Sequence, residues 1–346
     1  MTTSQPPVRF AVIGMNHGHI YGQVDLLLRA GAELVASYAA EPDLADAFGR
    51  AYPQARATRS PDDILEDRAV ELIVTAAIPD QRAGIGIAAM RHDKDVMSDK
   101  PAFTTLAQLE EVRKVQAETQ QIFSVCYSER FENAATVRAG ELALGGAIGR
   151  VVQTIGLGPH RANLASRPAW FFQSAHYGGI LTDIAAHQAD QFLFFTGSHS
   201  FEIVSAQVAN YAHPEHPELE DFGDITVRGD GGSGYLRVDW FTPDGLPTWG
   251  DTRLTVLGTD GYIEVRKNCD IGGRPGASHL FLVDHTGVQS IDCSGVALPY
   301  GPQLAQDVRD RTETAMSQRH CFLASELALQ GQAQAKRLGY LGPASG

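Results

Sequence analysis

Hydrophobic positions in the first third of the chain alternate between short continuous runs and helix-like spacing. An apolar run at 9–13 ends in Gly14. Apolar residues then recur at Ile20, Val24 and Leu27, which predicts a strand, a tight turn and a helix with one buried face. Strands alternating with helices indicate a doubly wound parallel sheet of the Rossmann type, covered on both faces. Further strands are expected at 34–38, 72–76, 95–98 and 122–126, and helices near 42–48, from Ser60, and at 81–91 and 106–117.

After Cys126 the pattern changes to strand-like runs separated by glycine-rich turns. Turns such as Gly231-Gly232 favour antiparallel strands joined by hairpins. The sequence therefore predicts an α/β domain at 1–126 and an α+β domain at 127–346 with an open, largely antiparallel sheet. In the second domain, strands are expected at 151–157, 203–211, 224–228, 235–241, 253–257 and 262–266, and helices at 133–144, 179–195 and 316–338.

Composition narrows the classes of partner. The 346 residues carry a formal net charge of -13, and no run of Lys or Arg reverses this locally. Nucleic acid and anionic membranes are therefore not expected partners. The polar N-terminus and the absence of an 18-residue apolar stretch predict a cytoplasmic protein. Four scattered cysteines argue against a disulfide framework or a zinc site.

The turn at 14–19 reads Gly-Met-Asn-His-Gly-His and takes the position of a dinucleotide-binding G-x-G-x-x-G motif. Only its first glycine, Gly14, is in register. Asn16 tolerates a left-handed backbone, so the sharp turn is retained. His17, Gly18 and His19 then line a helix N-terminus, which attracts anions such as a pyrophosphate. A strand–helix turn that binds no ligand is the alternative interpretation.

The end of the second predicted strand does not identify the nucleotide. Tyr38-Ala39-Ala40 offers no acid to the adenosine ribose before Glu41, and no arginine clearly selects NADP. The cofactor is therefore expected to be NAD or NADP, without a stated preference.

The fourth predicted strand ends in Ser98-Asp99-Lys100-Pro101. Ligands gather at the carboxyl ends of strands in an open parallel sheet, so Lys100 is well placed for chemistry. Pro101 restricts the backbone of Lys100 and fixes where its ammonium can reach. A solvated surface lysine is the alternative.

The predicted helix at 179–195 carries Asp183, His187 and Asp190 on one face. Asp183 could orient the imidazole of His187, making it a tunable acid or base near neutral pH. The alternative is a helix-surface pair worth a few tenths of a kcal/mol. A metal site is not expected, because no third ligand with suitable spacing follows.

Three features occur in fixed order: the strand, turn and helix at Gly14, the Asp-Lys-Pro at Lys100, and the Gly-Gly-x-x-x-Asp-x-x-x-His segment ending at His187. Together they resemble the glucose-fructose oxidoreductase, inositol dehydrogenase and MocA-like family (Gfo/Idh/MocA) over nearly the whole chain. Asp99 stands where that family usually has glutamate. With two fingerprint glycines missing, the chain resembles an atypical subgroup.

The resemblance implies an NAD(P)-dependent dehydrogenase or reductase acting on a sugar, cyclitol or related small molecule. Lys100, Asp183 and His187 would be catalytic, with His187 accepting a hydroxyl proton and Lys100 stabilising the alkoxide. The second domain would bind substrate and form a homodimer or homotetramer. The cofactor-binding residues would be Gly14, Asn16, His17, Gly18, His19, Tyr38, Ala77, Pro79, Asp99 and Lys100, and the substrate-binding residues Tyr127, Arg130, His160 and Arg161.

Two other functions stay open at this point. The eroded glycine turn fits a non-catalytic nucleotide sensor or partner-binding protein on the same fold. A lyase or hydrolase that uses the nicotinamide transiently is a further alternative, distinguished by the absence of net redox change.

Overall fold

The computed structural model describes residues 6–339, which form two compact units. The first unit runs to Cys126 and also includes Pro299–Phe322. The second covers Tyr127–Leu298 and resumes at Leu323. Residues 299–322 thus group with the first unit, although the sequence pattern placed them in the second domain. The Tyr300 hydroxyl lies 2.7 Å from that of Ser124 and explains part of this grouping.

The first unit contains a six-stranded parallel sheet with the order β3-β2-β1-β4-β5-β6. The order reverses between β1 and β4, which is where ligands bind in doubly wound sheets. The predicted Rossmann-type fold is confirmed. Its strands are β1 (Arg9–Ile13), β2 (Glu33–Tyr38), β3 (Arg56–Ala57), β4 (Leu72–Thr75), β5 (Asp95–Asp99) and β6 (Phe123–Cys126), and its helices are α1 (His19–Arg29), α2 (Pro42–Ala51), α3 (Asp62–Leu65), α4 (Pro79–Arg91), α5 (Leu106–Thr119) and α11 (Tyr300–Asp310).

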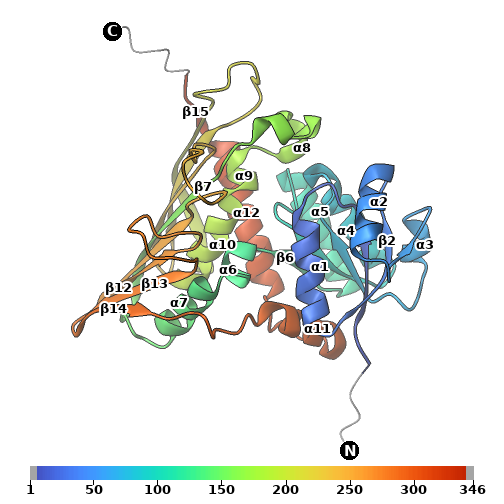
Figure 1. Cartoon of the computed structure of the whole chain (residues 1–346), viewed down its shortest axis with the longest axis horizontal. Helices are drawn as coiled ribbons and strands as arrows, with labels where there is room; N and C mark the ends of the chain where they lie inside the picture. The colour runs from blue at the N-terminus through green and yellow to red at the C-terminus, as the bar shows by residue number, and fades with distance from the viewer. Residues whose placement is uncertain (1–5, 340–346) are drawn as a thin grey trace, which may run out of the picture. The chain divides into compact units, whose positions relative to one another are not determined.

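The second unit contains a nine-stranded sheet with the order β14-β13-β12-β11-β7-β10-β9-β8-β15. Figure 1 labels β12, β13 and β14 towards one end of this sheet and β15 at the other. Only the β7–β10 and β8–β15 pairs are parallel, so the predicted open, largely antiparallel sheet is confirmed. Its strands are β7 (Val151–Pro159), β8 (Phe201–Ala209), β9 (Phe222–Gly229), β10 (Ser233–Asp239), β11 (Arg253–Gly258), β12 (Gly261–Arg266), β13 (His279–Asp284), β14 (Gly287–Ile291) and β15 (Lys336–Arg337). Its helices are α6 (Ser128–Phe131), α7 (Ala134–Leu144), η1 (Leu164–Ser166), η2 (Ala169–Phe172), α8 (Ser174–Tyr177), α9 (Ile180–Asp183) and α10 (Ala185–Thr196), and α12 (Gln318–Gln334) belongs to both units.

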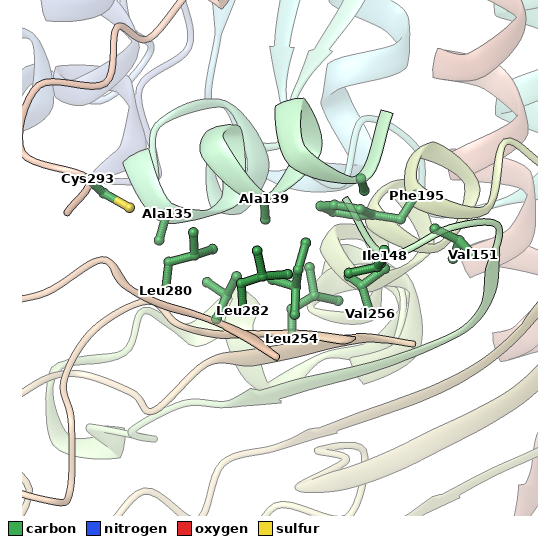
Figure 2. Packing of buried hydrophobic residues seen from close by; sticks show 13 residues of the cluster. Ala135, Ala139, Ile148, Val151, Phe195, Leu254, Val256, Leu280, Leu282 and Cys293 are labelled. Carbon is green, nitrogen blue, oxygen red and sulfur yellow. The ribbon is translucent and has the colours of Figure 1, made fainter. Parts of the chain in front are cut away.

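Helices cover one face of this large sheet. Ala135 and Ala139 of α7 belong to the same buried cluster as Leu254 of β11 and Leu280 of β13 (Figure 2). Along β11 and β13 buried and more exposed side chains alternate, because successive residues of a strand point to opposite faces. Burial of these alternate residues against α7 fixes the register of this half of the sheet.

Several predicted elements differ from the structure. The helix expected at 179–195 separates into α9 and α10 at Ile184, because the amide of His187 donates to the Ile184 carbonyl, only three residues back. The last helix is shorter than expected, and α11, β13 and β14 were not predicted. Within residues 6–339, no helix combines the length and hydrophobicity needed to cross a bilayer. The four cysteines are buried and form no disulfide.

Candidate active site

The turn after β1 depends on the backbone of Gly14. Its amide donates to the Tyr38 carbonyl at 2.9 Å, and its carbonyl accepts from the Ala76 amide at 3.1 Å. Gly14 has φ of +79°, and a Cβ on it would lie 2.5 Å from the Cβ of Ala77. Both the conformation and the space therefore require glycine here.

A cavity of about 350 Å³ lies beside this turn. The sequence-predicted residues Gly14, Asn16, Tyr38 and Ala77 all line it. Glu41 lines it as well, and its Oε1 accepts a hydrogen bond from the Asn16 side-chain amide at 2.8 Å. Asp62 is the second carboxylate in a lining that is otherwise largely apolar. Such a lining fits an adenosine, whose ribose hydroxyls can donate to a carboxylate.

Glu41 was not identified from the sequence, because it follows β2 by three residues. Its position immediately before Pro42, the first residue of α2, is the sequence feature that could have identified it. Pro79, another expected cofactor residue, is the first residue of α4 and is buried, but it is not among the residues lining the cavity.

The substituted residues of the turn contact the acid that precedes Lys100. The Nδ1 atom of His19 lies 3.0 Å from Asp99 Oδ1, and the Nδ1 atom of His17 lies 3.6 Å from Asp99 Oδ2. Two imidazoles thus connect the first βα turn to the end of β5. Burial, and then the charge of His19, hold the pKa of His17 well below its ordinary value, so the His17 ring is neutral at pH 7.

Gly18 is the N-cap of α1 and has an ordinary right-handed backbone. A Cβ on Gly18 would meet no atom within 4 Å. The turn therefore leaves open space at the positive end of α1, a fit for an anionic pyrophosphate.

Arg82 is completely buried on α4 and holds the Asp99-Lys100-Pro101 segment. Its Nη1 donates to the carbonyls of Lys100 at 2.7 Å and Pro101 at 3.0 Å, and its Nε donates to that of Ala77 at 2.7 Å. Its Nη2 forms an ion pair with Asp99 Oδ2 at 3.2 Å. Arg82 was missed in the sequence, where a lone arginine on a helix suggests an exposed side chain.

Asp99 is a buried anion in a cationic surrounding. Burial favours its neutral form, but the charges of His19 and Arg82 outweigh burial and hold the pKa of Asp99 well below its usual range. In the described part of the chain, His17, His19 and Asp99 are the group of three residues whose ligand atoms, all within 4.8 Å of one another, could coordinate a metal. Since Arg82 already neutralises this carboxylate, we interpret the group as a polar network around the Arg82–Asp99 ion pair.

In the second unit, His187 lies on the first turn of α10 and is 2% exposed. Its ring makes an edge contact with Tyr127, at 6.4 Å between centroids. The Tyr127 hydroxyl lies 3.0 Å from that of Ser325. Asp183, on α9, acts electrostatically on Arg167: burial lowers the pKa of Arg167 and the Asp183 charge raises it.

The remaining predicted substrate residues have different surroundings. Arg130 forms two 2.7 Å hydrogen bonds with Asp190, which places both of these side chains in a buried ion pair. Arg161 donates to the carbonyls of Pro243 and Leu246 and thereby holds a loop.

His160 belongs to an aromatic group. Its ring centroid lies 4.6 Å from that of Trp249 and 5.6 Å from that of Trp240. Trp249 is half-exposed. An exposed aromatic face beside an imidazole suits stacking against the apolar face of a sugar-like ring.

Comparisons with known proteins agree with this architecture. Residues 8–127 match the oxidoreductase family with an NAD-binding Rossmann fold (GFO/IDH/MocA), and residues 136–264 match the GFO/IDH/MocA C-terminal domain. A crystal structure of a protein classed as an oxidoreductase, from Erwinia carotovora atroseptica SCRI1043, is 44% identical; the alignment covers 96% of this chain and 100% of that one, with a TM-score of 0.94.

More distant structures share the fold. Levoglucosan dehydrogenase, in complex with NADH and levoglucosan, is 18% identical over 95% of this chain and 96% of its own, with a TM-score of 0.78. A 3-ketoreductase from Actinomadura kijaniata, in complex with NADP, is 15% identical over 96% and 99%, with a TM-score of 0.75. The chain is therefore a member of the GFO/IDH/MocA family of NAD(P)-binding oxidoreductases.

Proposed function

We propose that this protein is a dehydrogenase or reductase that interconverts a hydroxyl and a carbonyl on a sugar, cyclitol or related polyol, using NAD or NADP. One observation carries the proposal: Asp99 joins the nucleotide-binding turn, through His17 and His19, to the backbone position of Lys100. A cofactor held at that turn would thus have Lys100 close to its reactive end.

Residues of the first unit would bind the cofactor. Gly14, Asn16, Tyr38, Glu41 and Ala77 would hold the adenosine half in the cavity. The open N-terminus of α1, with His17, Gly18 and His19, would hold the pyrophosphate. When bound, the nicotinamide accepts or gives up a hydride.

The remaining chemistry is proton transfer and charge stabilisation. We assign His187 as the base that takes the proton of the substrate hydroxyl, and Lys100 as the cation that stabilises the alkoxide. Asp183 would adjust the charge near His187. Tyr127 and His160 would contact the substrate, whereas Arg130 and Arg161 would support the site through Asp190 and a loop.

We further expect a homodimer or homotetramer formed through the sheet face that lies opposite α10. Leu157 and Arg237 point to that face. Successive residues of a strand alternate between faces, and the Cα positions of Gly156 and Gly158 face Gln188 of α10, whereas the Leu236 side chain is buried. A cavity of about 570 Å³ is lined there by apolar residues and by two ion pairs, Arg237–Asp239 and Arg253–Asp251. Light scattering of the purified protein would test this expectation.

Calorimetry with NADH and NADPH, followed by a panel of polyols and ketoses, tests the enzymatic proposal. We expect binding of at least one nucleotide at micromolar concentration and reduction of NAD(P) with at least one polyol. No binding below millimolar nucleotide would overturn it. Cleavage of a substrate without accumulation of NAD(P)H would instead identify a lyase or hydrolase.

A further inference from the structure

Two oppositely charged side chains of the second unit are buried beside the helix turn that carries His187. Lys267, which follows β12, donates from Nζ to Oε2 of Glu129, on α6, at 2.6 Å. The side chains are 3% and 5% exposed. Neither residue was a candidate in the sequence, where they stand 138 positions apart.

Both charges are tied to α10 by hydrogen bonds. Gln188 donates to Glu129 Oε2 at 3.1 Å, and Gln191 Oε1 accepts from Lys267 at 2.7 Å. Gln191 also donates to the His187 carbonyl at 2.8 Å. The Glu129–Lys267 pair therefore fixes the position of Gln188, which follows His187. Through Gln191 it also fixes the backbone of His187.

Close packing reinforces this position. A Cβ on Gly156 would lie 2.8 Å from Cγ of Gln188, and one on Gly158 would lie 2.8 Å from its Nε2. These two glycines let the Gln188 side chain lie directly on β7 as it reaches Glu129. The turn of α10 that contains His187 is thus fixed from the sheet and from α6.

The need to attach α6 to α10 does not explain why Glu129 and Lys267, two charged residues, are buried here. The Arg130–Asp190 ion pair already joins α6 to α10 with two hydrogen bonds. Burying an ion pair costs desolvation energy that well-packed apolar residues avoid. Moreover, Oε1 of Glu129 is buried without a hydrogen-bond partner among the described residues, which leaves its negative charge acting on the surroundings.

Those surroundings include the imidazoles of the proposed substrate site. Burial disfavours ionisation of Glu129, but Lys267, His187 and His160 outweigh burial and lower its pKa to about 2. Electrostatic coupling is reciprocal, so ionised Glu129 favours the protonated forms of His187 and His160. Lys267 has the opposite effect.

We propose that Glu129 and Lys267 are positioning residues for His187: they fix its helix turn and, with charges of opposite sign, set how tightly its imidazole holds a proton. The inference rests on the proposed role of His187 as the base. Further charged or titratable groups on α10 and on the elements packed against it are Tyr127 and Arg130 at the start of and on α6, His160 after β7, Asp183 on α9 and Asp190 on α10 itself.

Removing the charge of Glu129 and removing that of Lys267 should shift the titration midpoint of His187 in opposite directions. Glu129→Gln removes the anion and should lower the titration midpoint of His187 by about one pH unit, because a buried carboxylate coupled to an imidazole favours the protonated ring. Lys267→Met removes the cation that neutralises Glu129 and should therefore raise the midpoint of His187. The double variant Glu129→Gln/Lys267→Met removes both charges and should titrate between the two single variants.

Nuclear magnetic resonance of histidine-labelled, full-length protein without nucleotide measures these midpoints, with His187→Ala used to assign the signal. Lys267→Arg keeps the charge and should leave the midpoint near that of the wild type. Asp224→Asn is a matched control, since this buried acid lies opposite Arg237 in the β9–β10 ladder and its carboxylate accepts a hydrogen bond from Gln207. This substitution should not shift the midpoint of His187.

Shifts of the same sign in both single variants, or no shift in Glu129→Gln, would overturn the inference. If Lys267→Met does not fold, Glu129→Gln is compared with the double variant, which differs from it only by the loss of Lys267. The midpoint of His187 should be higher in the double variant, and an equal or lower midpoint would contradict an effect of Lys267. The pH profile of kcat/KM should shift in parallel with the midpoints. Opposite shifts in the resonance without any nucleotide-dependent activity would support the electrostatic role while rejecting the proposed function.

Discussion

The side-chain amide of Asn16 donates to Oε1 of Glu41 at 2.8 Å, joining the first βα turn to the residue that precedes α2. This hydrogen bond leaves Glu41 directed to the same cavity as Gly14 and Tyr38. We therefore expect Glu41 to take the place of the ribose-binding acid that the sequence did not show at the end of β2.

Replacement of Glu41 should alter nucleotide affinity and preference. We expect Glu41→Ala to weaken NADH binding about 10- to 100-fold, the loss of hydrogen bonds to a charged acceptor worth roughly 1.5–3 kcal/mol. Glu41→Arg should favour NADPH, because the cation attracts a 2′-phosphate that the carboxylate repels. Calorimetric titration with both nucleotides measures the change, and unaltered affinities in Glu41→Ala would show that the acid does not contact the ribose.

Gly14 and Gly18 offer a matched pair of substitutions. Gly14→Ala must adopt φ near +79° and place its Cβ 2.5 Å from that of Ala77, so we expect a loss of about 1–3 kcal/mol in the free energy of unfolding. Gly18→Ala meets no protein atom and should change stability by less than about 0.5 kcal/mol.

Measurements of nucleotide binding distinguish the Gly14 and Gly18 variants further. If the space at Gly18 receives the pyrophosphate, Gly18→Ala should weaken binding while leaving denaturant unfolding unchanged. Equal stability losses in both variants would contradict this interpretation of the turn.

Removal of Arg82 should destabilise the first unit. Its guanidinium is buried and paired with Asp99 and three backbone carbonyls. Breaking a buried ion pair by removing one partner typically costs about 3–5 kcal/mol, so Arg82→Met should lower the unfolding free energy by this order. Arg82→Met/Asp99→Asn should recover part of the loss in urea unfolding, because no unpaired carboxylate then remains buried.

The buried imidazole of His17 predicts a specific pH dependence of stability. Its pKa is lowered in the folded protein by burial and by His19, so the unfolded chain binds a proton more readily. Stability from this group is therefore full above about pH 7 and decreases as the pH falls below about 6.5, the ordinary histidine pKa. His17→Asn should lose less stability than the wild type between pH 7.5 and 5.5, and parallel decreases in both proteins would contradict the assignment.

Substitution of Lys100 and His187 tests the chemical step. Loss of a general base or of alkoxide stabilisation costs about 10²- to 10⁴-fold in rate. We expect Lys100→Met and His187→Ala to lower kcat within this range, while both proteins still bind nucleotide through the cavity beside Gly14. Activity at the wild-type level in His187→Ala would assign the base to another group.

Local sequence patterns accounted for most of the fold. The strands around Gly14 and the end of β5 at Lys100 follow from buried runs and turn residues that lie close together in sequence. The break at Ile184 could not be predicted, since it arises from a change of hydrogen-bond partner within an uninterrupted apolar pattern. Strand β14 is largely exposed and therefore lacks the alternation by which strands are recognised.

The charged residues of the site were the least predictable. Arg82, Glu129 and Lys267 look like surface residues in sequence, because isolated charges are seldom buried. Each is buried only because a partner far away in the chain, such as Asp99 for Arg82, meets it after folding. No spacing rule connects such pairs in a single sequence.

The chain passes between its two units three times: after Cys126, after Leu298 and within α12. Neither unit is consequently a single stretch of sequence. A fragment ending at Cys126 would leave the Phe123 amide without Gln318 and Ser124 without Tyr300, both of which follow the first segment of the second unit, Tyr127–Leu298, in the chain. On the ribosome, the nucleotide-binding unit can therefore be completed only after most of the large sheet has emerged.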